Sequence, residues 1–148
     1  MSFLRVLWGL NHALDRRSKA MDRTLGVTGP QRLAVRLVGL VPGIHPSELA
    51  ELLCMHPSTL TGIVQRLVDA GFLVREADPD DGRRIRLTLT TAGEAVDRAT
   101  EGTVEAAVRT VLGSTGAEEV VNASALLHAI RRELEGPDDR TRMSEPKT

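Results

Sequence analysis

Arginines and aspartates are concentrated in a short polar segment between residues 75 and 86. The segment contains Arg75, Asp78, Asp80, Asp81, Arg83, Arg84 and Arg86. Guanidinium groups bind phosphate and enter narrow minor grooves, and carboxylates weaken that attraction unless they hold an arginine in a fixed pose. The segment therefore favours DNA recognition, with a merely solvated charged loop as the alternative.

A second group of small and polar residues lies just before this segment, on a helix predicted to begin at Pro57 and end before Gly71. The apolar positions of this helix are Leu60, Ile63, Val64 and Leu67. Its other side carries Ser58, Thr59, Thr61, Gly62, Gln65 and Arg66. Such a surface can approach a DNA groove without steric conflict, although two amphipathic helices could also form a plain helical hairpin.

The surrounding apolar periodicity predicts the elements that position these residues. One helix runs over 3–25, a second from Thr28 and Pro30 to about Val41, and a third opens near Pro46. Ala50 is the small residue needed where the third helix crosses the fourth. Two β-prone runs, 72–76 and 85–89, flank the arginine-rich tip as a hairpin.

The remainder of the chain is predicted to be helical. Thr90 or Thr91 caps a helix over 92–112, with Glu94 completing a capping box from Thr91. A last helix carries the apolar positions Val120, Leu127, Ile130 and Leu134.

The order of these elements predicts a mainly α fold with a small β-hairpin wing, a winged helix-turn-helix. Residues 28–112 are expected to form a DNA-binding lobe with a linking helix. Residues 1–27 and 113–136 are expected to be dimerisation helices, and 137–148 a disordered tail.

Three segments resemble the core of the MarR family of transcription regulators: 47–52, 57–75 and 78–93. The most specific parts are Asp-Asp-Gly-Arg at 80–83 and Leu-Thr-Thr-Ala-Gly at 89–93. The resemblance implies a homodimer that binds a pseudo-palindromic operator in double-stranded DNA, and repression is the default expectation.

The resemblance also implies roles for individual residues. Arg83 would enter the minor groove, Asp81 would position it, and Arg75 would contact the DNA backbone. The residues implied to face the major groove or its phosphates are Ser58, Thr59, Thr61, Gln65 and Arg66. Arg84 and Arg86 complete the predicted DNA-binding set.

The sequence departs from the family at two positions of this helix. The family commonly has arginine where Gly62 stands and an acid where Gln65 stands. Gln65 could instead read adenine through a bidentate pair, so we expect an operator preference different from that of better-known relatives.

Relatives often bind a small aromatic or phenolic ligand that relieves repression. Candidate lining residues here are Trp8, Asn11, His12, Arg32 and Arg36. An arginine or histidine beside a tryptophan could hold an aromatic carboxylate. The alternative is that Trp8 belongs to the core and the arginines face solvent.

The amino-acid composition limits which other kinds of function and site the chain could have. The net charge is −1, yet residues 1–40 carry seven basic and two acidic side chains, so a locally positive surface is possible. The single cysteine, Cys54, precludes an intrachain disulfide and is expected to be structural. The four histidines lack metal-ligand spacing.

We therefore expect no cofactor, no metal, no membrane span and a cytoplasmic location. No enzyme motif is present. The open alternative is a winged helix that binds protein without specific DNA recognition.

Overall fold

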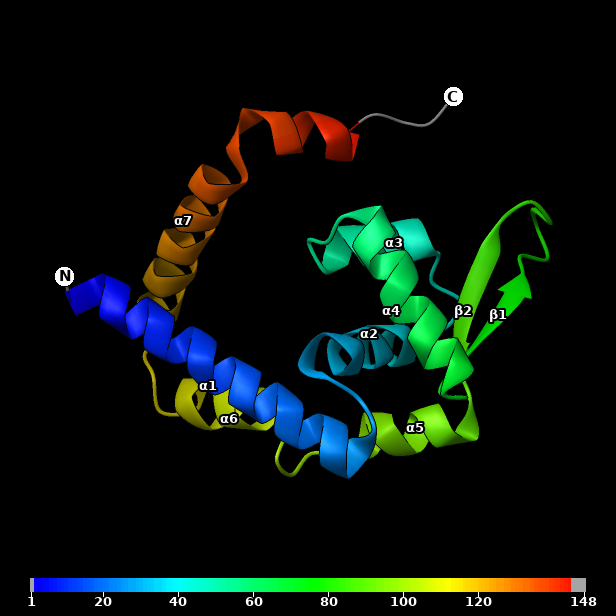
Figure 1. Cartoon of the computed structure of the whole chain (residues 1–148), viewed down its shortest axis with the longest axis horizontal. Coiled ribbons are helices and arrows are strands. Elements are labelled where there is room, and N and C mark those ends of the chain that lie inside the picture. The colour runs from blue at the N-terminus through cyan, green and yellow to red at the C-terminus, as the bar shows by residue number, and fades with distance from the viewer. Residues whose placement is uncertain (1, 145–148) are drawn as a thin grey trace. The chain divides into compact units, whose positions relative to one another are not determined.

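A computed structural model describes the backbone of residues 2–144 and the side chains of residues 2–136 (Figure 1). The elements are α1 (Ser2–Leu25), α2 (Gly29–Leu40), α3 (Pro46–Leu52), α4 (Pro57–Asp69), β1 (Leu73–Ala77), β2 (Ile85–Leu89), α5 (Thr91–Arg98), α6 (Val104–Leu112) and α7 (Ala117–Ser144). The chain divides into two compact units, residues 1–107 and 108–148. The predicted mainly α fold with a hairpin wing is confirmed.

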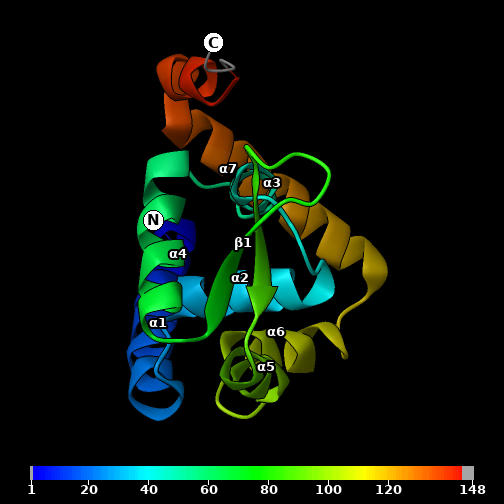
Figure 2. The ribbon, with the colours of Figure 1, turned by 90° about the vertical axis from the view of Figure 1, so that its right-hand side faces the viewer.

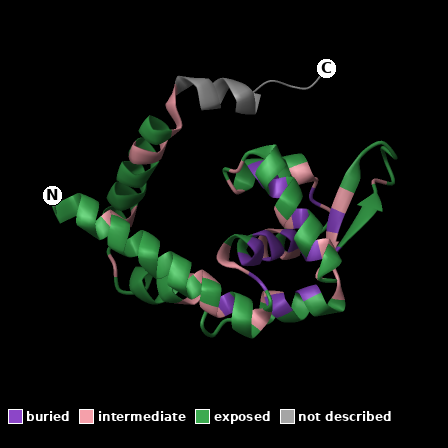
Figure 3. Ribbon diagram, viewed as in Figure 1, coloured by how far each residue is buried: buried purple, intermediate pink, exposed green. Residues whose placement is uncertain are grey.

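The first unit is organised around α2, which is the most buried helix of the lobe (Figure 3). Its start is fixed by a capping box: the Thr28 amide donates to Gln31 Oε1 at 2.8 Å, and the Gln31 amide donates back to Thr28 Oγ1. Reciprocal caps of this kind satisfy helix-end amides that would otherwise lack partners. Val35 and Val38 are fully buried members of the aliphatic core.

The helix-turn-helix is formed by α3 and α4. Ala50 is buried, as expected for the small residue at the helix crossing. Cys54 lies in the turn with φ of 50°, a left-handed conformation that is uncommon outside glycine. The Met55 amide donates to the Ala50 carbonyl at 2.9 Å, so the left-handed residue allows the chain to close tightly behind α3.

The hairpin of β1 and β2 is antiparallel, with Leu73 opposite Leu89 and Ala77 opposite Ile85 (Figure 2). It is tied to the lobe by a short bridge, in which the Leu87 amide donates to the Ile44 carbonyl at 3.0 Å. Leu87 is fully buried. The base of the wing is therefore part of the core, while its tip is exposed.

The prediction of one continuous helix over 92–112 is wrong. Helix α5 ends at Arg98 and α6 begins at Val104. Arg32 Nη2 donates to the carbonyls of Asp97 and Ala99, at 3.0 and 2.7 Å, and so binds acceptors that a continuing helix would use. Gly102 has φ of 71°, and Thr103 Oγ1 then accepts from the Ala106 amide to cap α6.

Of the two caps predicted for this helix, Thr90 is confirmed, whereas the capping box from Thr91 to Glu94 does not form. Thr90 is the N-cap of α5, and its hydroxyl accepts from the Gly93 amide at 3.0 Å. The Thr90 hydroxyl also donates to the Gly71 carbonyl at 2.6 Å. Thr90 thus joins the end of α4 to the start of α5.

The second unit contains the end of α6 and the long helix α7. Gly136 interrupts α7 with a non-helical conformation. The predicted disordered tail, 137–148, lies outside the residues whose side chains are described, and it stays a prediction. None of the helices in the described part of the chain is long and apolar enough to cross a membrane.

Candidate nucleic-acid interface

Helix α4 presents the two faces expected from its sequence. Leu60, Val64 and Leu67 are buried against the core. The opposite side is exposed along its length and carries Ser58, Thr59, Thr61, Gly62, Gln65 and Arg66. The helix is therefore anchored by one face, and its polar face is exposed to solvent.

The N-terminus of α4 is capped by a histidine. His56 Nδ1 accepts from the Ser58 amide at 3.2 Å and lies 2.7 Å from the Ser58 hydroxyl. The predicted site residue Ser58 thus takes part in the cap. Because Nδ1 accepts the amide bond, the neutral ring carries its proton on Nε2.

Gln65 and Arg75 are brought together from different elements. Arg75 Nη1, on β1, donates to Gln65 Oε1 at 2.8 Å. Gln65 Nε2 in turn donates to Asp69 Oδ1, one helical turn later, at 2.7 Å. The base of the wing and the exposed face of α4 therefore share one chain of hydrogen bonds.

The acidic residues of the wing organise its backbone. Asp81 Oδ1 accepts from the Arg83 amide at 3.1 Å, and Asp78 Oδ1 accepts from the Asp80 amide at 2.9 Å. Asp81 does contact Arg83, but through the backbone amide rather than the guanidinium. The side chains of Arg83 and Arg84 are exposed at the tip.

His45 joins the wing to the start of α3. Its Nε2 lies 3.1 Å from Asp78 Oδ2, and its Nδ1 lies 2.8 Å from the Ile85 carbonyl oxygen. The imidazole ring therefore contacts both strands' ends of the wing, at Asp78 and at Ile85. Sequence spacing offers no signal for a contact between residues 45 and 78.

The electrostatics of the wing centre on Asp78. The hydrogen bond from the Asp80 amide lowers the pKa of this carboxyl, and the Asp81 amide and the charges of His45 and Arg86 act in the same direction. Arg86 is half-buried, with its side chain against Gly43, and so lies nearer the wing base than Arg83 does.

The five residues predicted for an effector pocket separate into two groups. Trp8, Asn11 and His12 are exposed on α1. Arg32 and Arg36 lie on α2 and both contact Asp97, with Arg36 Nη1 at 2.7 Å from Asp97 Oδ1.

Arg32 is buried within a group of charges. Burial lowers the pKa of its guanidinium, while Glu105 and Asp97 oppose that shift. Its Nε and Nη1 lie 3.4 and 3.6 Å from the Glu105 and Asp97 carboxylates, as charge contacts without hydrogen-bond geometry.

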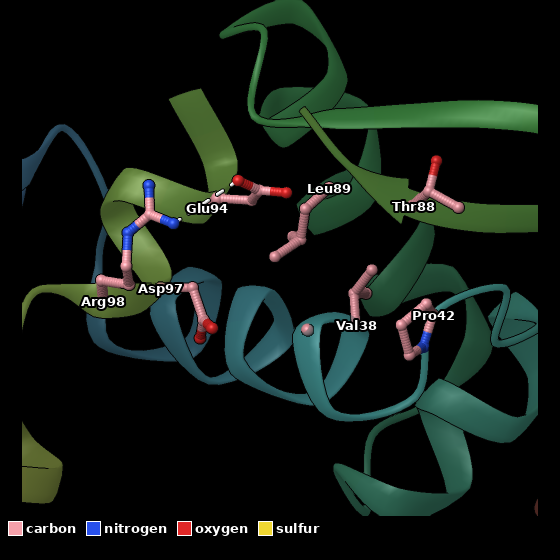
Figure 4. Close-up of a pocket in the computed structure, with 8 residues that line it drawn as sticks. Val38, Pro42, Thr88, Leu89, Glu94, Asp97 and Arg98 are labelled. Atoms are coloured by element: carbon pink, nitrogen blue, oxygen red, sulfur yellow. Dashed lines mark ion pairs between the residues drawn. The ribbon is translucent and has the colours of Figure 1, made fainter. Parts of the chain in front are cut away.

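A small pocket of about 240 Å³ lies elsewhere in the lobe, between α2, β2 and α5 (Figure 4). It is lined by Val38, Gly39, Pro42, Thr88, Leu89, Glu94, Asp97 and Arg98. None of the five predicted effector residues lines it. Among the described residues, no cluster of three or more His, Cys, Asp or Glu side chains could hold a metal ion.

Comparison with known proteins gives consistent matches. Residues 25–84 match the model of the MarR family. The transcriptional repressor Rv2887 of Mycobacterium tuberculosis is 33% identical over 107 residues, which span 72% of this chain and 77% of the repressor.

Two solved structures extend the similarity to the fold. The PcaV transcriptional regulator of Streptomyces coelicolor, solved with its natural ligand, has a TM-score of 0.68 at 26% identity, covering 85% of this chain and 89% of PcaV. The S. aureus MepR–DNA complex has a TM-score of 0.73 at 18% identity, covering 90% and 99% of the two chains, and shows likeness of fold alone.

Proposed function

The chain belongs to the MarR family of transcription regulators, and from that premise we propose that it represses transcription by binding a pseudo-palindromic operator as a homodimer. Helix α4 enters the major groove, and Arg83 at the wing tip enters the adjacent minor groove. The observation that carries this proposal is the pairing of an exposed polar face on α4 with a wing attached to it through Arg75 and Gln65.

The mode of DNA contact follows from the distribution of exposed groups. Ser58, Thr59 and Thr61 supply hydroxyls near the N-terminus of α4, where the helix dipole attracts phosphate. Arg66, Arg83 and Arg84 supply exposed guanidinium groups. Gly62 has no side chain that could contact DNA. The exposed arginines and the N-terminus of α4 therefore contribute most of the binding energy.

Dimerisation is supported by apolar side chains that lie exposed in the single chain. Phe3, Val6, Leu10 and Leu14 follow one face of α1 and are 40–68% exposed. In the second unit the exposed apolar residues include Val111, Val121, Leu127 and Leu134. Apolar surface of this kind is typical of a subunit interface.

We also propose that a small aromatic ligand relieves repression. PcaV was solved with its natural ligand, and Trp8, Asn11 and His12 form an exposed aromatic and polar group on α1. Trp8 is the single tryptophan of the chain, so its fluorescence reports binding nearby. Titration with benzoate should quench Trp8 and weaken DNA binding, whereas unchanged fluorescence and affinity would remove this group as a benzoate site.

The proposed place of action is the bacterial cytoplasm, where the chromosome is accessible to a regulator. The competing function is protein binding by the winged helix, without specific DNA recognition. The three aspartates of the wing are compatible with that function. The two functions differ in salt dependence, because each neutralised phosphate releases counterion.

The experiment is a gel-shift titration with DNA from upstream of the protein's own gene. We expect binding that weakens at least tenfold between roughly 50 and 200 mM salt. Arg83→Ala should weaken it by about tenfold, whereas Arg23→Ala, which removes an exposed arginine from the end of α1, should have little effect. No shift at low salt would contradict DNA binding, and equal losses in the two variants would contradict the minor-groove role of Arg83.

A further inference from the structure

The carboxamide of Gln65 is held at both ends by charged groups. Its Oε1 accepts a hydrogen bond from Arg75 Nη1 at 2.8 Å, and its Nε2 donates one to Asp69 Oδ1 at 2.7 Å. Asp69 lies on the same helix as Gln65, and Arg75 lies on β1. All three residues are exposed on the surface that carries the proposed DNA contacts.

The two partners fix which way the amide points. A guanidinium can only donate hydrogen bonds, and an ionised carboxylate can only accept them. Rotating the amide by 180° would set its N–H groups against Arg75 and its oxygen against Asp69, which loses both bonds. The orientation of Gln65 is therefore determined by chemistry, even though glutamine oxygen and nitrogen are otherwise hard to distinguish.

The remaining bonding capacity of the amide matches one base. A glutamine side chain has two N–H donors and two acceptor lone pairs, so one of each remains free after the contacts to Arg75 and Asp69. Adenine presents an acceptor, N7, and a donor, N6, in the major groove, whereas guanine presents two acceptors, N7 and O6. An oriented Gln65 satisfies both adenine groups and leaves guanine O6 facing an acceptor.

We propose that Asp69 and Arg75 are specificity-determining residues, which position Gln65 to read adenine in the operator without contacting that base themselves. This inference rests on the proposed entry of α4 into the major groove. It also gives Arg75 a role beyond the backbone contact predicted from its place at the wing base. Asp69 keeps this role despite being an acid near phosphates, because Arg75 balances its charge.

The test compares how well each variant distinguishes adenine from guanine at one position. Operator DNA bound by the wild-type protein is substituted pair by pair, and Gln65→Ala identifies the A·T pair whose discrimination depends on Gln65. At that pair we expect the wild-type protein to bind A·T more tightly than G·C by roughly fivefold to a hundredfold.

Asp69→Ala and Arg75→Met each remove one hydrogen-bond partner of the Gln65 carboxamide. Both substitutions are at exposed positions, where the core is not disturbed. Both should reduce the A·T preference to about threefold or less at this pair and leave discrimination at other pairs unchanged. Arg75→Lys keeps a donor within reach of Gln65 Oε1 and should restore most of the preference. Thermal melting of each variant checks that the fold is intact.

The results separate this inference from the function on which it rests. If Asp69→Ala and Arg75→Met retain the full preference, or lose discrimination equally at every pair, the positioning role is overturned while DNA binding stands. If no A·T pair depends on Gln65, the role is also overturned. If the wild-type protein binds no DNA specifically, both the proposed function and this inference fail.

Discussion

Two glycines of the lobe are expected to respond in opposite ways to an added methyl group. Gly62 lies in the middle of α4, and a Cβ there would meet nothing within 4 Å. A Cβ on Gly93, at the start of α5, would collide with the backbone carbonyl of Phe72. The first glycine therefore weakens a helix, while the second is required by close packing of the chain.

Gly62→Ala should raise the free energy of unfolding by about 0.5 to 1 kcal/mol, because alanine has the higher helix propensity. Gly93→Ala should lower it by several times that amount, because backbone atoms cannot move aside as a flexible side chain can. Urea denaturation of both variants measures the difference. Equal changes in the two proteins would contradict this description of their surroundings.

The charges around Arg32 join α2 to the end of α5 and the start of α6. Arg32 is only 2% exposed, and its charge is balanced by Asp97 and Glu105. Removing one partner of a fully buried pair costs roughly 3 to 5 kcal/mol. The cost should be smaller here because the Asp97 side chain is 19% exposed and Glu105 remains.

Asp97→Ala should therefore destabilise the protein by about 2 kcal/mol. The matched control is Glu94→Ala, which removes a carboxylate from the same helix. Glu94 pairs with Arg98 at the surface, so its loss should cost less than about 1 kcal/mol. Thermal unfolding of the two variants compares them, and a similar loss of stability in both would rule out a special role for the buried arginine.

The hairpin of β1 and β2 is stabilised by the ionised form of Asp78, which accepts hydrogen bonds from the Asp80 and Asp81 amides. The Asp80 amide lowers the pKa of Asp78, so the carboxylate contributes stability above its ordinary pKa of about 3.9 and loses it as pH falls through the lower folded value. We expect the Asp80 amide signal in NMR spectra to titrate below pH 3.9.

His45→Ala should move the pKa of Asp78 only part of the way back, since the Asp80 amide is the larger cause. Asp78→Asn should remove the contribution of Asp78 to the titration of the Asp80 amide. A midpoint at or above the ordinary aspartate value in the wild-type protein would contradict the hydrogen-bonded geometry of the wing.

Sequence patterns predicted most element boundaries because the signals are local. Pro30, Pro46 and Pro57 mark the starts of three helices, and Gly71 follows the end of α4. Local signals did not predict the break between α5 and α6. The break there depends on Arg32, which is 67 residues from Ala99 in the sequence and invisible to a periodicity argument.

The sequence predicted which residues belong to the candidate site, but it did not predict which of their side chains contact one another. The exposed polar face of α4 follows directly from its apolar spacing. The contacts of Gln65 with Arg75, and of His45 with Asp78, join different elements and depend on the tertiary arrangement of the wing. Long-range side-chain partners of this kind carry no repeating sequence signal.

The exposed apolar face of α1 is the proposed dimer interface. A dimer should have twice the 16.0 kDa mass of one chain. Leu10→Glu places a charge on that face and should shift the protein toward monomer, measured by light scattering after size exclusion. Arg16→Glu changes charge on a different side of the helix and should leave the dimer intact. A wild-type monomer at micromolar concentration would contradict the proposed assembly.

In the proposed homodimer, two copies of α4 and of the wing contact one stretch of DNA together. Hydroxyl-radical footprinting upstream of the protein's own gene tests it most directly. We expect two symmetric protected segments with centres about 34 Å apart, one turn of B-DNA, and loss of the flanking minor-groove protection in Arg83→Ala. A single asymmetric protected segment, or no protection at low salt, would contradict DNA binding by a symmetric dimer.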